Sequence, residues 1–80
     1  MRLDKYLKVS RIIKRRTVAA ELCDAGKVKV NGSVAKPARN INVGDIVELR
    51  FGEKILKIKV KLLNESIKKE DAQEMYCVVD

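Results

Sequence analysis

The dipeptide Asn31-Gly32 constrains the fold of this chain more than any other short segment. It separates the runs VKV (28–30) and SVAK (33–36), in which apolar and polar residues alternate. Asn-Gly between two alternating runs is the strongest short-range signal for a two-residue hairpin, because both residues tolerate a positive φ. The chain from Lys27 onward is therefore expected to form strands.

Three further strands are expected beyond this hairpin, each after a turn or a polar loop. They span 46–51 (IVELRF) after the turn NVGD, 55–62 after the turn GEK, and 75–79 (MYCVV) after the polar segment 64–74. The polar segment is expected to be a loop with a short helical turn. A strand set of this kind, joined by short turns, indicates a small and mostly antiparallel sheet.

The residues before Lys27 follow a helical period instead. Apolar residues recur at helical spacing in 2–9, which predicts a short helix with its basic residues outward. Thr17 is the expected N-cap of a second helix over 18–25, and Gly26 stands where a left-handed residue ends a helix. The predicted class is α+β, with an N-terminal helix pair packed on the sheet and one domain over residues 1–80.

Positive charge is concentrated at the N-terminus. The chain of 80 residues has a net charge of +7, and residues 1–16 supply +6 of it through seven basic residues and one acid. Segregated charge indicates a polyanionic partner, with nucleic acid favoured over an acidic membrane surface. Solubility alone is a weaker explanation, because it does not require segregation. The candidate RNA-binding residues are Arg2, Asp4, Lys5, Lys8, Arg11, Lys14, Arg15 and Arg16.

Asp4 is the one acid among these residues, and three roles for it remain open. It could fix the geometry of a nearby arginine, Arg16 or Arg15, through a charge-assisted pair. It could accept a hydrogen bond from a base or a 2′-hydroxyl of RNA. It could also act only electrostatically at the start of the first helix. The pairing role is favoured, and all three predict that Asp4→Arg is harmful.

The composition argues against an enzyme and against a metal or cofactor site. The chain has no histidine, and its cysteines, Cys23 and Cys77, have no zinc-binding spacing. Free thiols fit a reducing cytoplasm, no secretory signal is expected, and the longest apolar run is too short for a membrane span. The aromatics Tyr6, Phe51 and Tyr76 are expected in the core, which disfavours a base-stacking platform. The lysines Lys57, Lys59 and Lys61 are expected on a solvated sheet face.

The order of RLDKYL, RRTVAAELCDAGKVKVNG and VGDIVEL resembles the alpha-L RNA-binding motif of ribosomal protein S-four, pseudouridine synthases and tyrosyl-tRNA synthetases. The motif core covers about residues 2–50, and the C-terminal strands fall in 51–80. The matching positions are Arg2, Leu3, Asp4, Leu7, Arg16, Ala20, Gly26, Val28, Val30, Asn31, Gly32, Gly44 and Asp45. The resemblance implies an RNA-binding domain.

Within that superfamily the front of the chain and the tail KKEDAQEMY are similar to the small stand-alone RqcP family. This similarity implies binding to a stalled large ribosomal subunit that carries peptidyl-tRNA, with contacts to large-subunit ribosomal RNA and tRNA. It also implies support of a partner, RqcH, in alanine tailing of the nascent chain. The free protein is expected to be a monomer. The alternatives are a heat-shock-type factor that recycles blocked large subunits, whose long basic C-terminal extension is missing here, and another rRNA-binding assembly factor.

Overall fold

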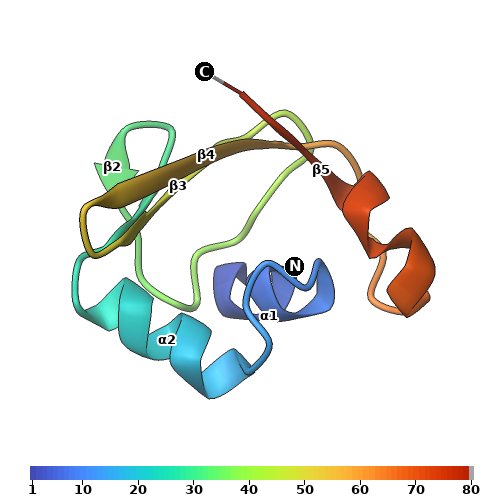
Figure 1. Cartoon of the computed structure of the whole chain (residues 1–80), viewed down its shortest axis with the longest axis horizontal. Helices are drawn as coiled ribbons and strands as arrows, with labels where there is room; N and C mark the ends of the chain where they lie inside the picture. The colour runs from blue at the N-terminus through green and yellow to red at the C-terminus, as the bar shows by residue number, and fades with distance from the viewer. Residues whose placement is uncertain (80) are drawn as a thin grey trace.

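The computed structural model describes residues 1–79 and places two helices against one face of a five-stranded antiparallel sheet (Figure 1). The helices are α1 (Leu3–Val9) and α2 (Arg16–Asp24). The strands are β1 (Val28–Val30), β2 (Ser33–Val34), β3 (Ile46–Phe51), β4 (Lys54–Val60) and β5 (Tyr76–Val78), and a 3-10 helix, η1 (Lys69–Met75), precedes β5. The predicted α+β class with an N-terminal helix pair is confirmed.

The hairpin between β1 and β2 forms at the predicted dipeptide. Asn31 has a φ of 51° and Gly32 a φ of 87°, and Val30 pairs with Ser33 across the turn. Two consecutive positive φ values are the mark of a type I′ turn, which matches the twist of the flanking strands. The sheet then continues in the order β2-β1-β3-β4-β5.

The core lies between the helices and one face of the sheet. The register aligns Val30, Val47 and Ile58 in one row across β1, β3 and β4, and all three are almost fully buried. They pack with the buried side chains of α1, among which Leu3 and Leu7 are fully buried. Because side chains alternate along a strand, the intervening residues point to the opposite, helix-free face of the sheet.

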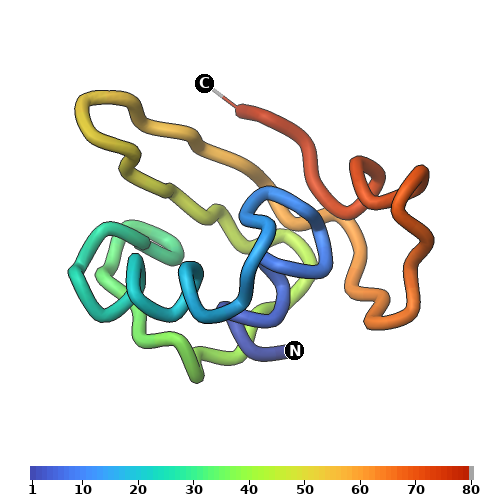
Figure 2. The backbone as a smooth tube through the Cα atoms, turned by 60° about the horizontal axis from the view of Figure 1, so that its bottom comes forward, coloured from blue at the N-terminus to red at the C-terminus, as the bar shows by residue number. Residues whose placement is uncertain are grey.

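The start of α1 is fixed by a distant segment of the chain. The N–H groups of Leu3 and Asp4 donate to the carbonyl oxygens of Arg39 and Pro37, at 2.8 and 3.1 Å, and the N-cap residue Arg2 makes no side-chain cap hydrogen bond. Residues 37–41 therefore run beside the N-terminus of α1, as the tube in Figure 2 shows. These bonds satisfy amides that a helix leaves free at its first turn, and they set the positions of Arg2 and Asp4.

The predicted N-cap of the second helix is wrong. Arg15, with extended backbone at φ −123° and ψ 132°, occupies the N-cap position, so α2 begins at Arg16 and Thr17 lies inside its first turn. Arg15 makes no side-chain cap hydrogen bond. Tertiary packing of the buried residues Ile13 and Ala19 on either side of the junction has overridden the local preference of Thr17. The predicted left-handed Gly26 is confirmed, at φ 74°.

The last strands and one aromatic also differ from expectation. Strand β4 ends at Val60, because the N–H groups of Lys61 and Leu62 both donate to the carbonyl of Met75. Met75 ends η1, so β5 is shorter than predicted. Phe51 was expected in the core but is 40% exposed, since it ends β3 at the turn into β4, beyond the cover of the helices.

Candidate nucleic-acid interface

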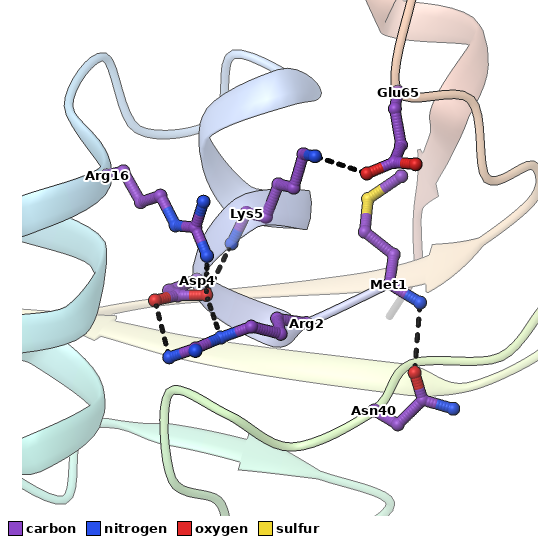
Figure 3. Close-up of polar contacts among 7 residues, drawn as sticks. All are labelled: Met1, Arg2, Asp4, Lys5, Arg16, Asn40 and Glu65. Atoms are coloured by element: carbon purple, nitrogen blue, oxygen red, sulfur yellow. Dashed lines mark hydrogen bonds and ion pairs between the residues drawn. The ribbon is translucent and has the colours of Figure 1, made fainter.

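A buried carboxylate joins the two helices. Asp4, in the first turn of α1, is only 4% exposed. Its Oδ1 and Oδ2 atoms accept hydrogen bonds from Nε and Nη2 of Arg2, both at 3.2 Å, and Oδ1 also accepts one from Nη2 of Arg16 at 3.4 Å. Figure 3 shows both guanidinium groups converging on this carboxylate. We call these three residues the Arg2–Asp4–Arg16 cluster.

The cluster holds its arginines while leaving them available to solvent. The side chain of Asp4 is 6% exposed, whereas those of Arg2 and Arg16 are 52% and 45% exposed. A guanidinium carries five N–H donors, of which Arg2 uses two on Asp4 and Arg16 uses one. The remaining donors can bind an external acceptor, and the planar fork of arginine matches the oxygens of a phosphate. The carboxylate therefore orients two anion-binding groups without consuming them.

The N-terminus of α2 adds a second attraction for anions. Its first turn holds no acid, and Arg15 and Arg16 stand at the end of the helix dipole that already carries positive character. Within residues 1–79 no acceptor is assigned to the N–H groups of Arg16, Thr17 and Val18. Placing arginines at this end is unfavourable for the isolated helix, but it suits an external phosphate.

The other predicted residues differ in whether they take part in an ion pair. Lys8, Lys14 and Arg15 are exposed, and none of the ion pairs within residues 1–79 involves them. Lys5 turns away to form an ion pair with Glu65 (Figure 3). The structure therefore unites only part of the predicted set around Asp4.

Arg11 takes a left-handed backbone conformation, at φ 63°, just after the end of α1. This position normally favours glycine, because a Cβ is disfavoured there. Arg11 therefore carries backbone strain that a glycine would not.

Two partners were missed by the sequence reasoning. Arg2 makes the closer contact with Asp4, at two residues' separation, and only Arg16 of the two arginines proposed as partners bonds to it. The two-residue spacing of Arg2 and Asp4 across the start of a helix could have suggested the pair between them. Glu65 lies 60 residues from Lys5, and no local pattern indicates that pair.

The groups beneath the interface are held in their neutral forms. Burial, followed by the nearby carboxylates of Asp4 and Asp24, raises the pKa of the Cys23 thiol to about 11. Burial also raises the pKa of Tyr6, whose hydroxyl donates to the carbonyl of Met75 at 2.7 Å. The hydrogen bond from Lys5 lowers the pKa of the exposed Glu65. Burial thus keeps the Cys23 thiol and the Tyr6 hydroxyl neutral, whereas the buried carboxylate of Asp4 is paired with two arginines.

Comparison with known proteins identifies the class of fold. The model of the S4 domain family matches residues 1–47. The trimeric structure of heat shock protein 15 from Vibrio cholerae superposes with a TM-score of 0.90 at 31% identity, covering 99% of this chain and 81% of that one. None of the helices in residues 1–79 is both long enough and apolar enough to span a membrane.

Curated relatives extend the match to nearly the whole chain. Proteins named "RQC P-site tRNA stabilizing factor" from Streptococcus pneumoniae and Bacillus subtilis are 60% and 47% identical over 79 residues. The alignments cover 99% of this chain and 90% and 92% of the relatives. The chain belongs to the S4 domain family and, within it, to the family of RQC P-site tRNA stabilizing factors, RqcP.

Proposed function

We propose that this chain is a non-catalytic RNA-binding factor that stabilises P-site tRNA on the large ribosomal subunit during ribosome quality control. The observation that carries the proposal is the Arg2–Asp4–Arg16 cluster, in which one buried carboxylate orients two half-exposed guanidinium groups. The name of the relatives supplies the P-site tRNA as the ligand. The physical question is how this surface binds RNA.

Phosphate contacts are the basis of binding. Each cation that neutralises a phosphate releases a counterion, so affinity falls with salt concentration. A-form RNA hides its bases in a deep and narrow major groove, so an oriented basic surface recognises the shape of the backbone more than its sequence. Two guanidinium groups fixed at one separation read that shape better than flexible lysines can.

The predicted residues receive distinct roles in this proposal. Arg2 and Arg16 contact phosphate directly, and Asp4 is a positioning residue that acts through them. The surrounding cations add charge and steering. They are Lys5, Lys8, Arg11, Lys14 and Arg15, all carried by α1, by the connection between the helices or by the N-cap of α2.

The remaining features of the proposal are those expected from the sequence and from the family resemblance. The chain acts in the cytoplasm as a single RNA-binding domain over residues 1–80 and is monomeric when free. Its partners are large-subunit ribosomal RNA, peptidyl-tRNA and RqcH, which it supports in alanine tailing. The S4 domain match and the relatives' names support the RNA and tRNA parts of this statement.

A heat-shock-type factor that recycles blocked large subunits is the second candidate. The TM-score of 0.90 to heat shock protein 15 favours it as a related activity. The identities favour quality control, because this chain is 60% identical to the Streptococcus pneumoniae relative over 79 residues but 35% identical to the Haemophilus influenzae heat shock protein 15 homolog over 65 residues.

Co-sedimentation across a salt series tests the proposal. The ligands are large subunits bearing peptidyl-tRNA, empty large subunits and an unrelated RNA duplex. We expect the wild type to prefer tRNA-bearing subunits at moderate salt, and Arg16→Ala and Asp4→Arg to lose that preference. Lys69→Ala, at an exposed lysine of η1, is the matched control and should keep it. Equal binding to all three ligands, with Asp4→Arg unharmed, would reject the proposal.

A further inference from the structure

The face of the sheet that points away from the helices carries a second basic surface. It consists of Lys29 on β1, Arg50 on β3, Lys57 and Lys59 on β4, and Lys27 just before β1, all exposed. We call this set the sheet face. Figure 1 shows α1 and α2 on the other side of the sheet. The two basic surfaces therefore belong to opposite sides of one small domain.

The strand register places these cations in adjacent rows. Lys29 lies opposite Glu48, which lies opposite Lys57, and Arg50 lies opposite Ile55 in the next row. Neighbouring strands are about 4.8 Å apart and alternate residues along a strand are about 7 Å apart. The cations thus form a grid along and across the sheet, with Glu48 as the single acid inside it.

The charge of the sheet face is not neutralised within the protein. The ion pairs of residues 1–79 use only Asp4 and Glu65 as acids, so no carboxylate there lies within 4.0 Å of a sheet-face cation. An ordinary solvated face mixes both signs, whereas this one sets five cations against one acid. Edge protection does not explain it, because β3 and β4 are interior strands.

The shape of the sheet face suits an extended polyanion. Two hollows on it, of about 140 and 260 Å³, share Glu48 as a lining residue. Both are smaller than the cavities of about 300–1,000 Å³ that hold small molecules. A protein interface would need an apolar centre, but Val34 and Ile55, its most exposed apolar residues, stand at separate ends of the face. A membrane surface would need aromatic anchors, and the face has none.

We propose that the sheet face binds the phosphate backbone of a second RNA segment, so that one chain joins two RNA elements held on opposite sides. This inference rests on the proposed function, because stabilising a tRNA on a ribosomal subunit requires contact with both RNAs. The Arg2–Asp4–Arg16 cluster takes one element and the sheet face takes the other. The domain then acts as a spacer between two polyanions that would otherwise repel each other.

The stoichiometry of binding to a short RNA duplex tests the inference without ribosomes. Analytical ultracentrifugation with excess duplex of about 16 base pairs should show two duplexes per wild-type chain. The triple variant Lys29→Gln, Lys57→Gln and Lys59→Gln should bind one duplex, because it loses three of the five phosphate-binding cations of the sheet face. The matched triple Lys54→Gln, Lys68→Gln and Lys69→Gln loses the same charge elsewhere and should still bind two. Arg2→Gln with Arg16→Gln should bind one.

A bridging assay supplies the second readout. A duplex on beads, loaded with the protein, should capture a second labelled duplex in the wild type and the matched triple, but not in the sheet-face triple. Circular dichroism of each variant checks that the fold is kept. A single duplex per wild-type chain, or equal capture by both triples, would overturn the inference. So would a sheet-face triple that keeps both duplexes and loses only binding to anionic vesicles or to an acidic protein.

The experiments distinguish a failure of this inference from a failure of the proposed function. Two duplexes per chain with no preference for tRNA-bearing subunits would reject the proposed function and keep the inference. Preference for those subunits in the sheet-face triple, equal to that of the wild type, would reject the inference and keep the proposed function.

Discussion

Nη2 of Arg16 lies 3.4 Å from Oδ1 of Asp4, although the two residues begin different helices. This contact ties the start of α2 to the start of α1 and gives the basic N-terminal segment one defined geometry. The carboxylate is buried and the guanidinium is not, so the pair faces outward. RNA binding by this chain should therefore depend on the fixed positions of its arginines as well as on net charge.

Asp4→Asn is predicted to weaken RNA binding although it makes the chain more positive. The amide carries no negative charge and has one acceptor oxygen where the carboxylate has two, so Arg2 and Arg16 lose their common ionic anchor. We also expect a loss of about 1 kcal/mol of stability, because both arginines are half-exposed and solvent screens the pair. Fluorescence anisotropy with a labelled RNA duplex gives the affinity. Asp24→Asn, at an exposed acid of α2, adds the same charge and should bind at least as well as the wild type.

Arg11→Gly is predicted to stabilise the fold and weaken RNA binding. Glycine relieves the left-handed strain at φ 63°, which is worth about 1 kcal/mol and raises Tm by about 5 °C. The lost guanidinium lowers affinity for duplex RNA. Arg11→Ala removes the same side chain without relieving the strain, so it should lose affinity and gain no Tm. An unchanged affinity in both variants would remove Arg11 from the interface.

Alkaline pH is predicted to destabilise the protein from about pH 9. The pKa of Cys23 rises on folding from an ordinary 9.0 to about 11, so the stability it contributes is present below pH 9 and is lost between pH 9 and about 11. The slope for this one group is at most about 1.4 kcal/mol per pH unit. Urea unfolding at several pH values measures it. Cys23→Ala should flatten the curve between pH 9 and 11, and an unchanged slope in that variant would contradict the assignment.

Tyr6→Phe is predicted to lower the free energy of unfolding by about 1 kcal/mol at neutral pH, which is the net value of the hydrogen bond from Tyr6 to the Met75 carbonyl. That oxygen keeps its bond from the N–H of Lys61, so no buried acceptor is orphaned. The pKa of Tyr6 is raised above its ordinary 10.0, so its contribution disappears as the pH rises above 10. The difference in unfolding free energy between wild type and variant should therefore narrow above pH 10. A difference that is constant with pH would show that the hydroxyl does not titrate with unfolding.

Glu65→Gln is predicted to strengthen RNA binding about twofold at low salt, since it frees Lys5 from its exposed ion pair. The gain should vanish at high salt, where exposed charges are screened. Glu70→Gln removes an exposed acid of η1 that is in none of the ion pairs of residues 1–79, so it serves as the control. Equal gains in both variants would attribute the effect to net charge and not to Lys5.

Local chemistry explains what could be predicted from sequence. Asn31-Gly32 specifies its own turn, because both residues accept positive φ and the flanking runs alternate. Gly26 ends α2 for the same backbone reason. The bounds of β3 were also predictable, since a turn residue stands on each side of it. The composition of residues 1–16 showed the surplus of positive charge, but it did not show how the basic side chains are arranged in space.

The choice of Arg16 over Arg15 as the partner of Asp4 was decided by tertiary structure. Successive helical residues differ by about 100° around the axis, so the start of α2 determines which arginine faces Asp4. The start of α2 depends on the packing of the buried Ile13 and Ala19. The N-cap preference of Thr17 does not predict it. Phe51 was misplaced for a related reason, because an apolar residue at a strand end is buried only if another element covers it.

The sequence by itself determined the elements, their order and the surplus of positive charge, because backbone preference, periodicity and composition are local properties. Only the tertiary structure decided that Asp4 is buried between two arginines and that five other cations share the opposite face of the sheet. Both depend on which residues, far apart in the chain, are brought to one surface by the burial of a common core.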